Sequence, residues 1–389
     1  MTDRLDKICF LPPPIDTPWT GPPPDPPGVQ FKRRDGRDVQ IDLPLFWFEP
    51  AWHHVAARMA DQIAVAVADQ GVIVSALNSD LSEPEQESEF CSPLVEESHQ
   101  EPSDTEPPYE GSSHLARILP YRAERYGFQP KDLIGPRVID VRLSIARDPK
   151  GHYGYSPRRI ERWKATPADR PLAGGGWVPA ASFLPDVPSL KQLDAKLDQL
   201  RDLSPRSAVF VSFSSHRLRT DLPSILETRP DGLILRLNDI PLTGMQIAEI
   251  TVLARKMTDE LAGNETPLWV VPGPMSPDDA VKLLALGASA IAVDDWCAGI
   301  IESVAQAKSA SQTATGYQGY QGYQSNQSAI SVLRQVIEEN LAPKVERFEG
   351  LCTSLRAIPS DQRLACLSGR WAKSLGIPAL AMPRVTHEP

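Results

Sequence analysis

The chain has 389 residues, which is enough for one large domain or two, and its 41% hydrophobic and 23% charged residues are typical of a globular protein. The formal net charge of −10 comes from one stretch, since the eleven acidic and no basic residues from Asp80 to Glu110 leave +1 for the rest of the chain. The sequence lacks a basic stripe with interleaved aromatics, which argues against nucleic-acid binding, and it lacks an apolar run long enough to predict a membrane span. Its five cysteines are scattered and form no CxxC motif, which predicts a cytoplasmic protein.

The N-terminal region, residues 1–38, is predicted to be a proline-rich arm. Its segment LPPPIDTPWTGPPPDPPG (Leu11–Gly28) is typical of an extended, polyproline-like chain. Residues 78–114 are acidic and rich in serine and proline, and they are predicted to be a disordered insertion. Either segment could bind a protein partner, and a plain surface arm or loop is the alternative.

Short apolar segments and amphipathic helices alternate along residues 39–308. Strands are predicted at Val39–Phe48, Val72–Leu77, Arg137–Ile145, Ser207–Phe213, Asp231–Leu237, Pro267–Gly273 and Ala288–Asp294. Helices are predicted between them, at Pro50–Gly71, Ser189–Leu203 and Thr243–Gly263 among others. Strands that are apolar on both faces and separated by helices indicate a parallel sheet, and seven of them favour a (β/α)₈ TIM barrel. No glycine fingerprint follows the first strand, which argues against a dinucleotide-binding fold.

Two further regions follow the predicted barrel. Residues 309–329 include the repeat GYQGYQGYQSNQS and are predicted to be a low-complexity linker, because the repeat is too polar to pack. Residues 330–389 are predicted to form a C-terminal helical extension.

The order of segments from about Leu43 to Pro378 resembles the FMN-binding barrel of glutamate synthase in its stand-alone form. RPLAGGGWVPA (Arg170–Ala180) is similar to the family's KPGEGGxLPG, and PDDAVKLLALGASAIAV (Pro277–Val293) is similar to its GRDVVKAALLGA helix and last strand. The resemblance implies FMN-dependent reductive amination of 2-oxoglutarate in glutamate biosynthesis. It implies FMN contacts at Arg170, Gly175, Ser212, Asp239, Gly273 and Ser276.

Several positions depart from the family's pattern. The family's GGTGA turn is NDIPLTG here, so Ile240–Leu242 stand where glycines let the backbone approach the flavin. Ser212 replaces the lysine of the family's VSVKL, and Asp294–Asp295 replace a glycine–threonine turn, where two carboxylates would repel a phosphate. Only Cys297 lies where the family has three clustered cysteines, so no iron–sulfur cluster is expected.

Two hypotheses of different classes follow. The chain is an FMN-dependent oxidoreductase of the glutamate synthase type, or it is a catalytically inactive relative that acts as a binding or regulatory subunit. No catalytic residue and no metal site is assigned, and Asp294–Asp295 are interpreted as solvated loop carboxylates, with Cys297 as a buried structural thiol. Arg142, Arg170 and Arg236, at or near strand ends, either line a cavity for an anionic ligand or form structural ion pairs.

Overall fold

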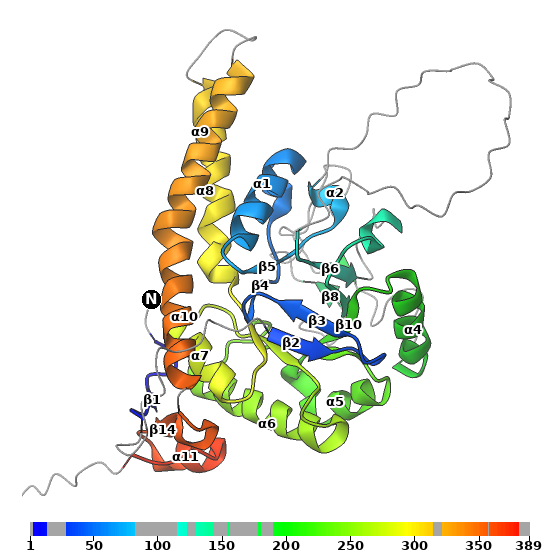
Figure 1. Cartoon of the computed structure of the whole chain (residues 1–389), viewed down its shortest axis with the longest axis vertical. Helices are drawn as coiled ribbons and strands as arrows, with labels where there is room; N and C mark the ends of the chain where they lie inside the picture. The colour runs from blue at the N-terminus through cyan, green and yellow to red at the C-terminus, as the bar shows by residue number, and fades with distance from the viewer. Residues whose placement is uncertain are drawn as a thin grey trace, which may run out of the picture.

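The computed structural model describes residues 3–13, 29–81, 115–122, 130–143, 154–155, 178–179, 190–313, 321–356 and 358–380. Eight strands form a closed barrel in which every neighbouring pair is parallel, and the last strand pairs with the first (Figure 1). They are β4 (Leu45–Trp47), β5 (Ile73–Ser75), β6 (Arg117–Arg122), β7 (Val138–Arg142), β10 (Ala208–Ser214), β11 (Gly232–Arg236), β12 (Leu268–Val271) and β13 (Ala290–Ala292). The predicted (β/α)₈ barrel is therefore confirmed.

The barrel contains one strand more than the sequence predicts. Strand β6 follows the acidic insertion and carries Pro120, a residue that usually argues against a central strand because it has no N–H to donate. The predicted strand Val39–Phe48 is in fact two strands separated by a turn at Pro44: β3 (Asp38–Ile41) and β4. Their burial patterns differ, since β3 alternates between exposed and buried residues and β4 is buried throughout.

A hairpin closes the N-terminal end of the barrel. Strands β2 (Val29–Lys32) and β3 pair antiparallel, and Phe31 places its ring against Phe210 and Trp269 inside the barrel, at centroid distances of 5.2 and 6.1 Å. Buried aromatic pairs of this kind contribute beyond their burial alone. Strand β2 lies within residues 1–38, so part of the predicted arm belongs to the barrel core.

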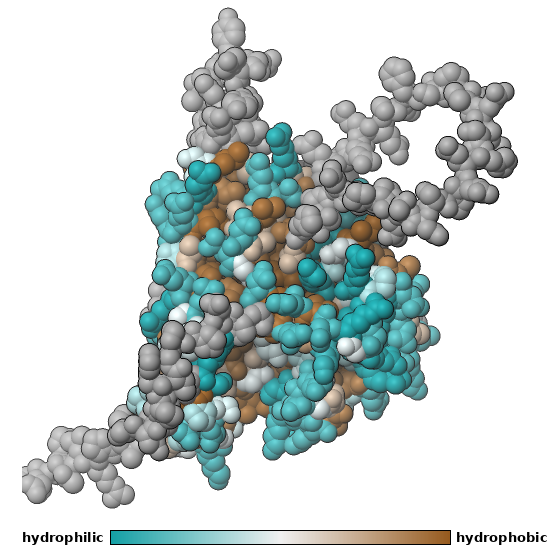
Figure 2. Space-filling view, in the orientation of Figure 1, coloured by the Kyte–Doolittle hydropathy of each residue, from teal (hydrophilic) through white to brown (hydrophobic). Residues whose placement is uncertain are grey.

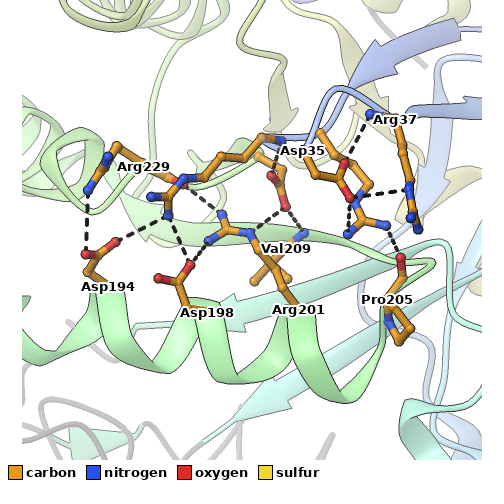
Figure 3. Close-up of polar contacts among 11 residues, drawn as sticks. Asp35, Arg37, Asp194, Asp198, Arg201, Pro205, Val209 and Arg229 are labelled. Carbon is orange, nitrogen blue, oxygen red and sulfur yellow. Dashed lines mark hydrogen bonds and ion pairs between the residues drawn. The ribbon is translucent and has the colours of Figure 1, made fainter.

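Polar contacts fix the hairpin to the strand starts and to helix α4 (Leu193–Leu203) (Figure 3). The backbone N–H of Arg34 donates to Asp231 at 2.7 Å, and its guanidinium contacts Asp198 at 3.0 Å. Asp231 also accepts from the Val209 backbone and pairs with Arg201 at 3.3 Å. Because this end of a TIM barrel serves stability, we place the candidate site at the opposite end.

Helices cover the outside of the barrel (Figure 1). They are α1 (Ala57–Ala68), the short α2 (Asn78–Leu81), α4, α5 (Leu218–Glu227), α6 (Gly244–Ala262), α7 (Pro277–Ala285) and α8 (Asp294–Thr313). Helix α6 begins where the sequence predicts, because Thr243 and Gln246 form a reciprocal capping box. The backbone at 78–81 is helical, and residues 82–114 of the predicted insertion lie outside the described residues.

A long helical hairpin extends from the barrel beyond its last strand. Helix α8 packs against α9 (Gln321–Val336), which continues through a π-helical turn (Ile337–Leu341) into α10 (Ala342–Arg356), and α10 packs on α7 (Figure 1). Both helices extend into the predicted linker 309–329, since α8 ends at Thr313 and α9 begins at Gln321.

The two ends of the chain meet in a small sheet that the sequence does not predict. Strand β1 (Ile8–Phe10) pairs antiparallel with β14 (Leu364–Cys366), next to α11 (Gly369–Leu375). The C-terminal extension is therefore helical with one strand. The face in Figure 2 is largely hydrophilic over α4 and α5. Among the described residues, no helix has the length and apolar character that a membrane crossing requires.

Candidate functional site

Polar side chains occupy the C-terminal half of the barrel interior, whereas the N-terminal half is apolar. Strand residues two apart share a face, so the polar residues continue the inward rows that begin with residues such as Val138 and Phe210. The inward polar residues are Ser75, Asp140, Arg142, Ser212, Ser214 and Arg236, and each is at most 4% exposed. Active sites of TIM barrels lie at this end, so this polar layer is the candidate functional site.

Arg142 is held by partners on three strands or their ends, namely β4, β5 and its own strand β7. Its Nε donates to Asp140, its Nη1 lies 3.4 Å from Glu49 Oε1, and its Nη2 donates to the Phe48 carbonyl at 2.9 Å. Nη2 also lies 3.4 Å from the Ser75 hydroxyl, and the guanidinium lies 3.8 Å above the Phe48 ring. Of the two interpretations of Arg142, the structural ion pair is therefore the correct one.

Ser212 and Asp239, two of the residues that resemblance assigns to FMN, are bound to neighbours within the protein. The Ser212 hydroxyl is fully buried and donates to Asp140, so it completes the Arg142 cluster. Asp239 Oδ2 lies 3.6 Å from Arg236 Nε. The pattern Asp-x-Arg within an apolar strand could have predicted the Asp140–Arg142 pair, because residues two apart point to the same side.

The loop between β12 and α7 carries Gly273 and Ser276, the two predicted phosphate contacts. Gly273 has a φ of +78°, and a Cβ there would lie 3.6 Å from Asn238 and 3.8 Å from the guanidinium of Arg4. The Ser276 hydroxyl accepts from the Asp279 backbone N–H at 3.2 Å and so caps α7. Both residues serve the local fold of the loop.

The N-terminal segment Asp3–Pro13, here called the N-terminal strap, lies across this loop. The Arg4 guanidinium donates to the carbonyls of Pro272, Pro274 and Leu242 at 3.2, 3.1 and 2.6 Å. The backbone N–H groups of Arg4 and Leu5 donate to the buried Asp279 carboxylate at 2.7 and 3.0 Å. The strap thus joins the loops that follow β11 and β12. No local sequence signal links Arg4 to residues so distant in the chain.

Gly244→Ala should loosen the strap. A Cβ at Gly244 would lie 2.0 Å from the Arg4 carbonyl oxygen and 2.5 Å from its carbon, and backbone atoms cannot swing aside as a flexible side chain can. We expect a loss of about 1–3 kcal/mol in the free energy of unfolding, as for other overpacked sites. Urea denaturation measures the stability, and trypsin cleavage after Arg4 measures the release of the strap.

Gly299→Ala is the matched control, because nothing lies within 4 Å of a Cβ at that helical position. It should leave stability unchanged or raise it slightly, since alanine favours helix. Equal stability and equal trypsin sensitivity of the two variants would show that the strap does not press on Gly244.

Asp294 and Asp295 are not solvated loop carboxylates, which corrects the interpretation from sequence. They lie in the first turn of α8, where Asp294 Oδ1 accepts from the Glu49 backbone N–H at 2.7 Å and Asp295 Oδ2 accepts from the Met275 backbone N–H at 3.3 Å. Asp294 Oδ2 and Asp295 Oδ1 are buried and have no hydrogen-bond partner among the described residues. The two carboxylates join the end of β13 to the neighbouring loops on both sides.

Burial sets the protonation of this pair. It raises the pKa of Asp294 to about 7, with the Glu49 and Asp295 carboxylates adding to the rise and hydrogen bonds from the Glu49 and Phe48 amides opposing it. Burial raises the pKa of Asp295 to about 6, where the Met275 amide, Lys344 and Arg4 oppose the rise. The predicted burial of Cys297 is confirmed, and burial raises the pKa of its thiol well above the usual value.

The described residues do not fit the phosphate of FMN. Phosphates bind at loop amides and helix N-termini, and in TIM barrels often at the loops after the seventh and eighth strands, here β12 and β13. In this chain the Met275 amide donates to Asp295, and carbonyls of the β12 loop face Arg4. The half-buried Leu242, in place of a glycine turn, packs on the core. Arg170 and Gly175 lie outside the described residues. Within the described ranges, no group of three or more His, Cys, Asp or Glu could hold a metal ion.

Comparison with known proteins gives only a fold-level likeness. No family model and no curated protein matches the chain. Among solved structures, mandelate oxidase with (S)-2-phenylpropionate is 16% identical, covers 93% of this chain and 86% of its own, and has a TM-score of 0.48. A mutant mandelate oxidase with a monooxide FMN adduct is 16% identical, with 93% and 88% covered and a TM-score of 0.45. At these values the likeness carries no argument, and the strand order alone assigns the fold.

Proposed function

We propose that this chain is a TIM-barrel binding or regulatory subunit that does not use FMN, in preference to an FMN-dependent enzyme that reductively aminates 2-oxoglutarate. The observation that supports this proposal is the hydrogen bond that the Met275 amide donates to Asp295. A flavin phosphate would meet two carboxylates where it needs N–H donors, and like charges there oppose its binding.

Internal contacts of the polar layer support the same proposal. Ser212 stands where the resemblance places a lysine, and its hydroxyl is bound to Asp140. Ile240–Leu242 stand where the resemblance places small glycines, and the Leu242 carbonyl accepts from Arg4. Ser212 and Leu242, which stand where the resemblance places flavin contacts, are thus bound to other groups of the protein. In a binding subunit, the proline-rich arm and the acidic segment 78–114 are the proposed elements for a protein partner.

Visible absorption tests the proposal. The purified full-length protein is incubated with excess FMN, passed through a gel-filtration column and scanned for the flavin bands. We expect no flavin to elute with the protein. Stoichiometric flavin in the protein peak would overturn the proposal and return the chain to the FMN-dependent oxidoreductases, with glutamate synthase assays as the next measurement.

A further inference from the structure

Two buried arginines stand in the polar layer, and their surroundings differ. Arg142 has two carboxylates, a carbonyl, a hydroxyl and an aromatic ring around its guanidinium. Arg236 is equally buried, at 4% exposed, but its guanidinium has fewer close contacts among the described residues. Its Nη2 donates to the Leu143 carbonyl at 3.1 Å, and its Nε has no hydrogen-bond partner in the part of the chain that the structure describes.

The ion pair of Arg236 with Asp239 leaves that Nε unsatisfied. The Asp239 oxygen lies 3.6 Å from Nε, which is too long for a hydrogen bond although it balances part of the charge. A buried donor without a partner costs free energy, and such groups in native proteins call for an explanation. An acceptor that arrives with a ligand is one such explanation, because it would complete the hydrogen bonding of the guanidinium.

Other polar groups converge on the same place. Ser214 on β10 and Arg236 on β11 are register partners, so both side chains leave the strands on the inward face. The Ser214 hydroxyl is hydrogen-bonded to Nδ1 of His216, and His216 itself is exposed at the rim. A buried guanidinium, a hydroxyl and an imidazole therefore stand together at the ends of two neighbouring strands.

We propose that the barrel mouth binds a small ligand through its carboxylate, held by Arg236 with Ser214 and His216 beside it. A guanidinium recognises two oxygens of an oxyanion through paired N–H donors, which fits a carboxylate or a phosphate. The nearby acidic side chains decide between them. The carboxylates of Asp140, Glu49 and Asp239 already face the guanidiniums of Arg142 and Arg236, so a singly charged ligand carboxylate meets less repulsion there than a phosphate dianion.

This inference names a ligand class for the binding role proposed above, and it rests on that role only in requiring that no flavin fills the mouth. The site lies on β10 and β11, whereas the contacts that exclude the flavin phosphate lie after β12 and β13. The two proposals therefore fail separately. A flavin band overturns the first, and a flat carboxylate titration overturns the second.

Ligand titrations of the full-length protein test the site. Acetate, benzoate, succinate and inorganic phosphate are titrated at constant ionic strength and followed by the midpoint of thermal unfolding and by calorimetry. We expect at least one carboxylate to raise the midpoint and to bind more tightly than phosphate. No response to any of the carboxylates, or tighter binding of phosphate, would overturn the proposal.

Variants assign the binding to the proposed residues. Arg236→Gln should weaken carboxylate binding about tenfold or more, because a hydrogen-bonded charge is lost. Arg217→Gln is the matched control, since Arg217 is an exposed arginine one residue beyond His216 and should bind as the wild type does. Unchanged affinity in Arg236→Gln would overturn the proposal. If that variant does not fold, Ser214→Ala decides, and wild-type affinity in Ser214→Ala would equally reject the site.

Discussion

Asp140→Ala is expected to lower the free energy of unfolding by roughly 3 kcal/mol or more, the usual cost of removing one partner of a buried ion pair. The carboxylate is fully buried, bonds Arg142 Nε, and accepts the Ser212 hydroxyl. Among the described residues, its loss leaves Arg142 with Glu49 as its counter-charge, and it leaves a buried hydroxyl without its acceptor. Urea denaturation followed by tryptophan fluorescence measures the change.

The exposed pair Lys256–Glu260 provides the control. Its side chains are 72% and 63% exposed, so Glu260→Ala should cost less than about 0.5 kcal/mol. The double variant Asp140→Leu with Arg142→Met should recover much of the loss, because apolar replacement of a buried pair is often neutral. A single Asp140→Ala variant as stable as Glu260→Ala would mean that Arg142 does not depend on this carboxylate.

The barrel could be predicted from sequence because most of its strands are recognisable from their own short stretches of residues. A run such as SAVFVSF is apolar on both faces and is bounded by helices, which indicates a strand of a parallel sheet wherever it lies in the chain. Strand β6 was not predicted, because Pro120 weakens that signal. The pairing of β1 with β14 could not be predicted, because it joins segments at opposite ends of the chain and each is only three residues long.

The candidate site could be predicted only in part, for a related reason. Sequence placed Arg142 and Arg236 near strand ends but left open whether they line a ligand cavity or form ion pairs, and that depends on where Glu49 and Asp239 lie in space. The resemblance pointed to Gly273 and Ser276 and gave no sign of Arg4, which binds the same loop from the start of the chain. The hydrogen bond from the Met275 amide to the Asp295 carboxylate could not be predicted either, because it joins two loops that meet only in the folded chain.

Stability should fall as the pH rises from about 4 to about 7, and Asp294→Asn should remove much of that fall. The folded state raises the pKa of Asp294 from 3.8 to about 7, so it holds a proton that the unfolded chain releases. The contribution is therefore complete below about pH 4 and is lost as the pH rises through about 7. At about 1.36 kcal/mol per pKa unit it corresponds to roughly 4 kcal/mol.

Asparagine mimics the protonated acid and keeps an oxygen that can accept from the Glu49 amide. Asp294→Asn should therefore match the wild type near pH 4 and exceed it increasingly in stability up to about pH 8, with urea midpoints measured at intervals between. Asp295→Asn is the paired comparison, and its advantage should be smaller and should level off at lower pH, because the pKa of Asp295 is raised only to about 6. A stability difference that stays constant from pH 5 to pH 8 would mean that Asp294 is ionised throughout. The carboxylates at the end of β13 would then carry full negative charge, which would oppose a phosphate at that end of the barrel even more strongly.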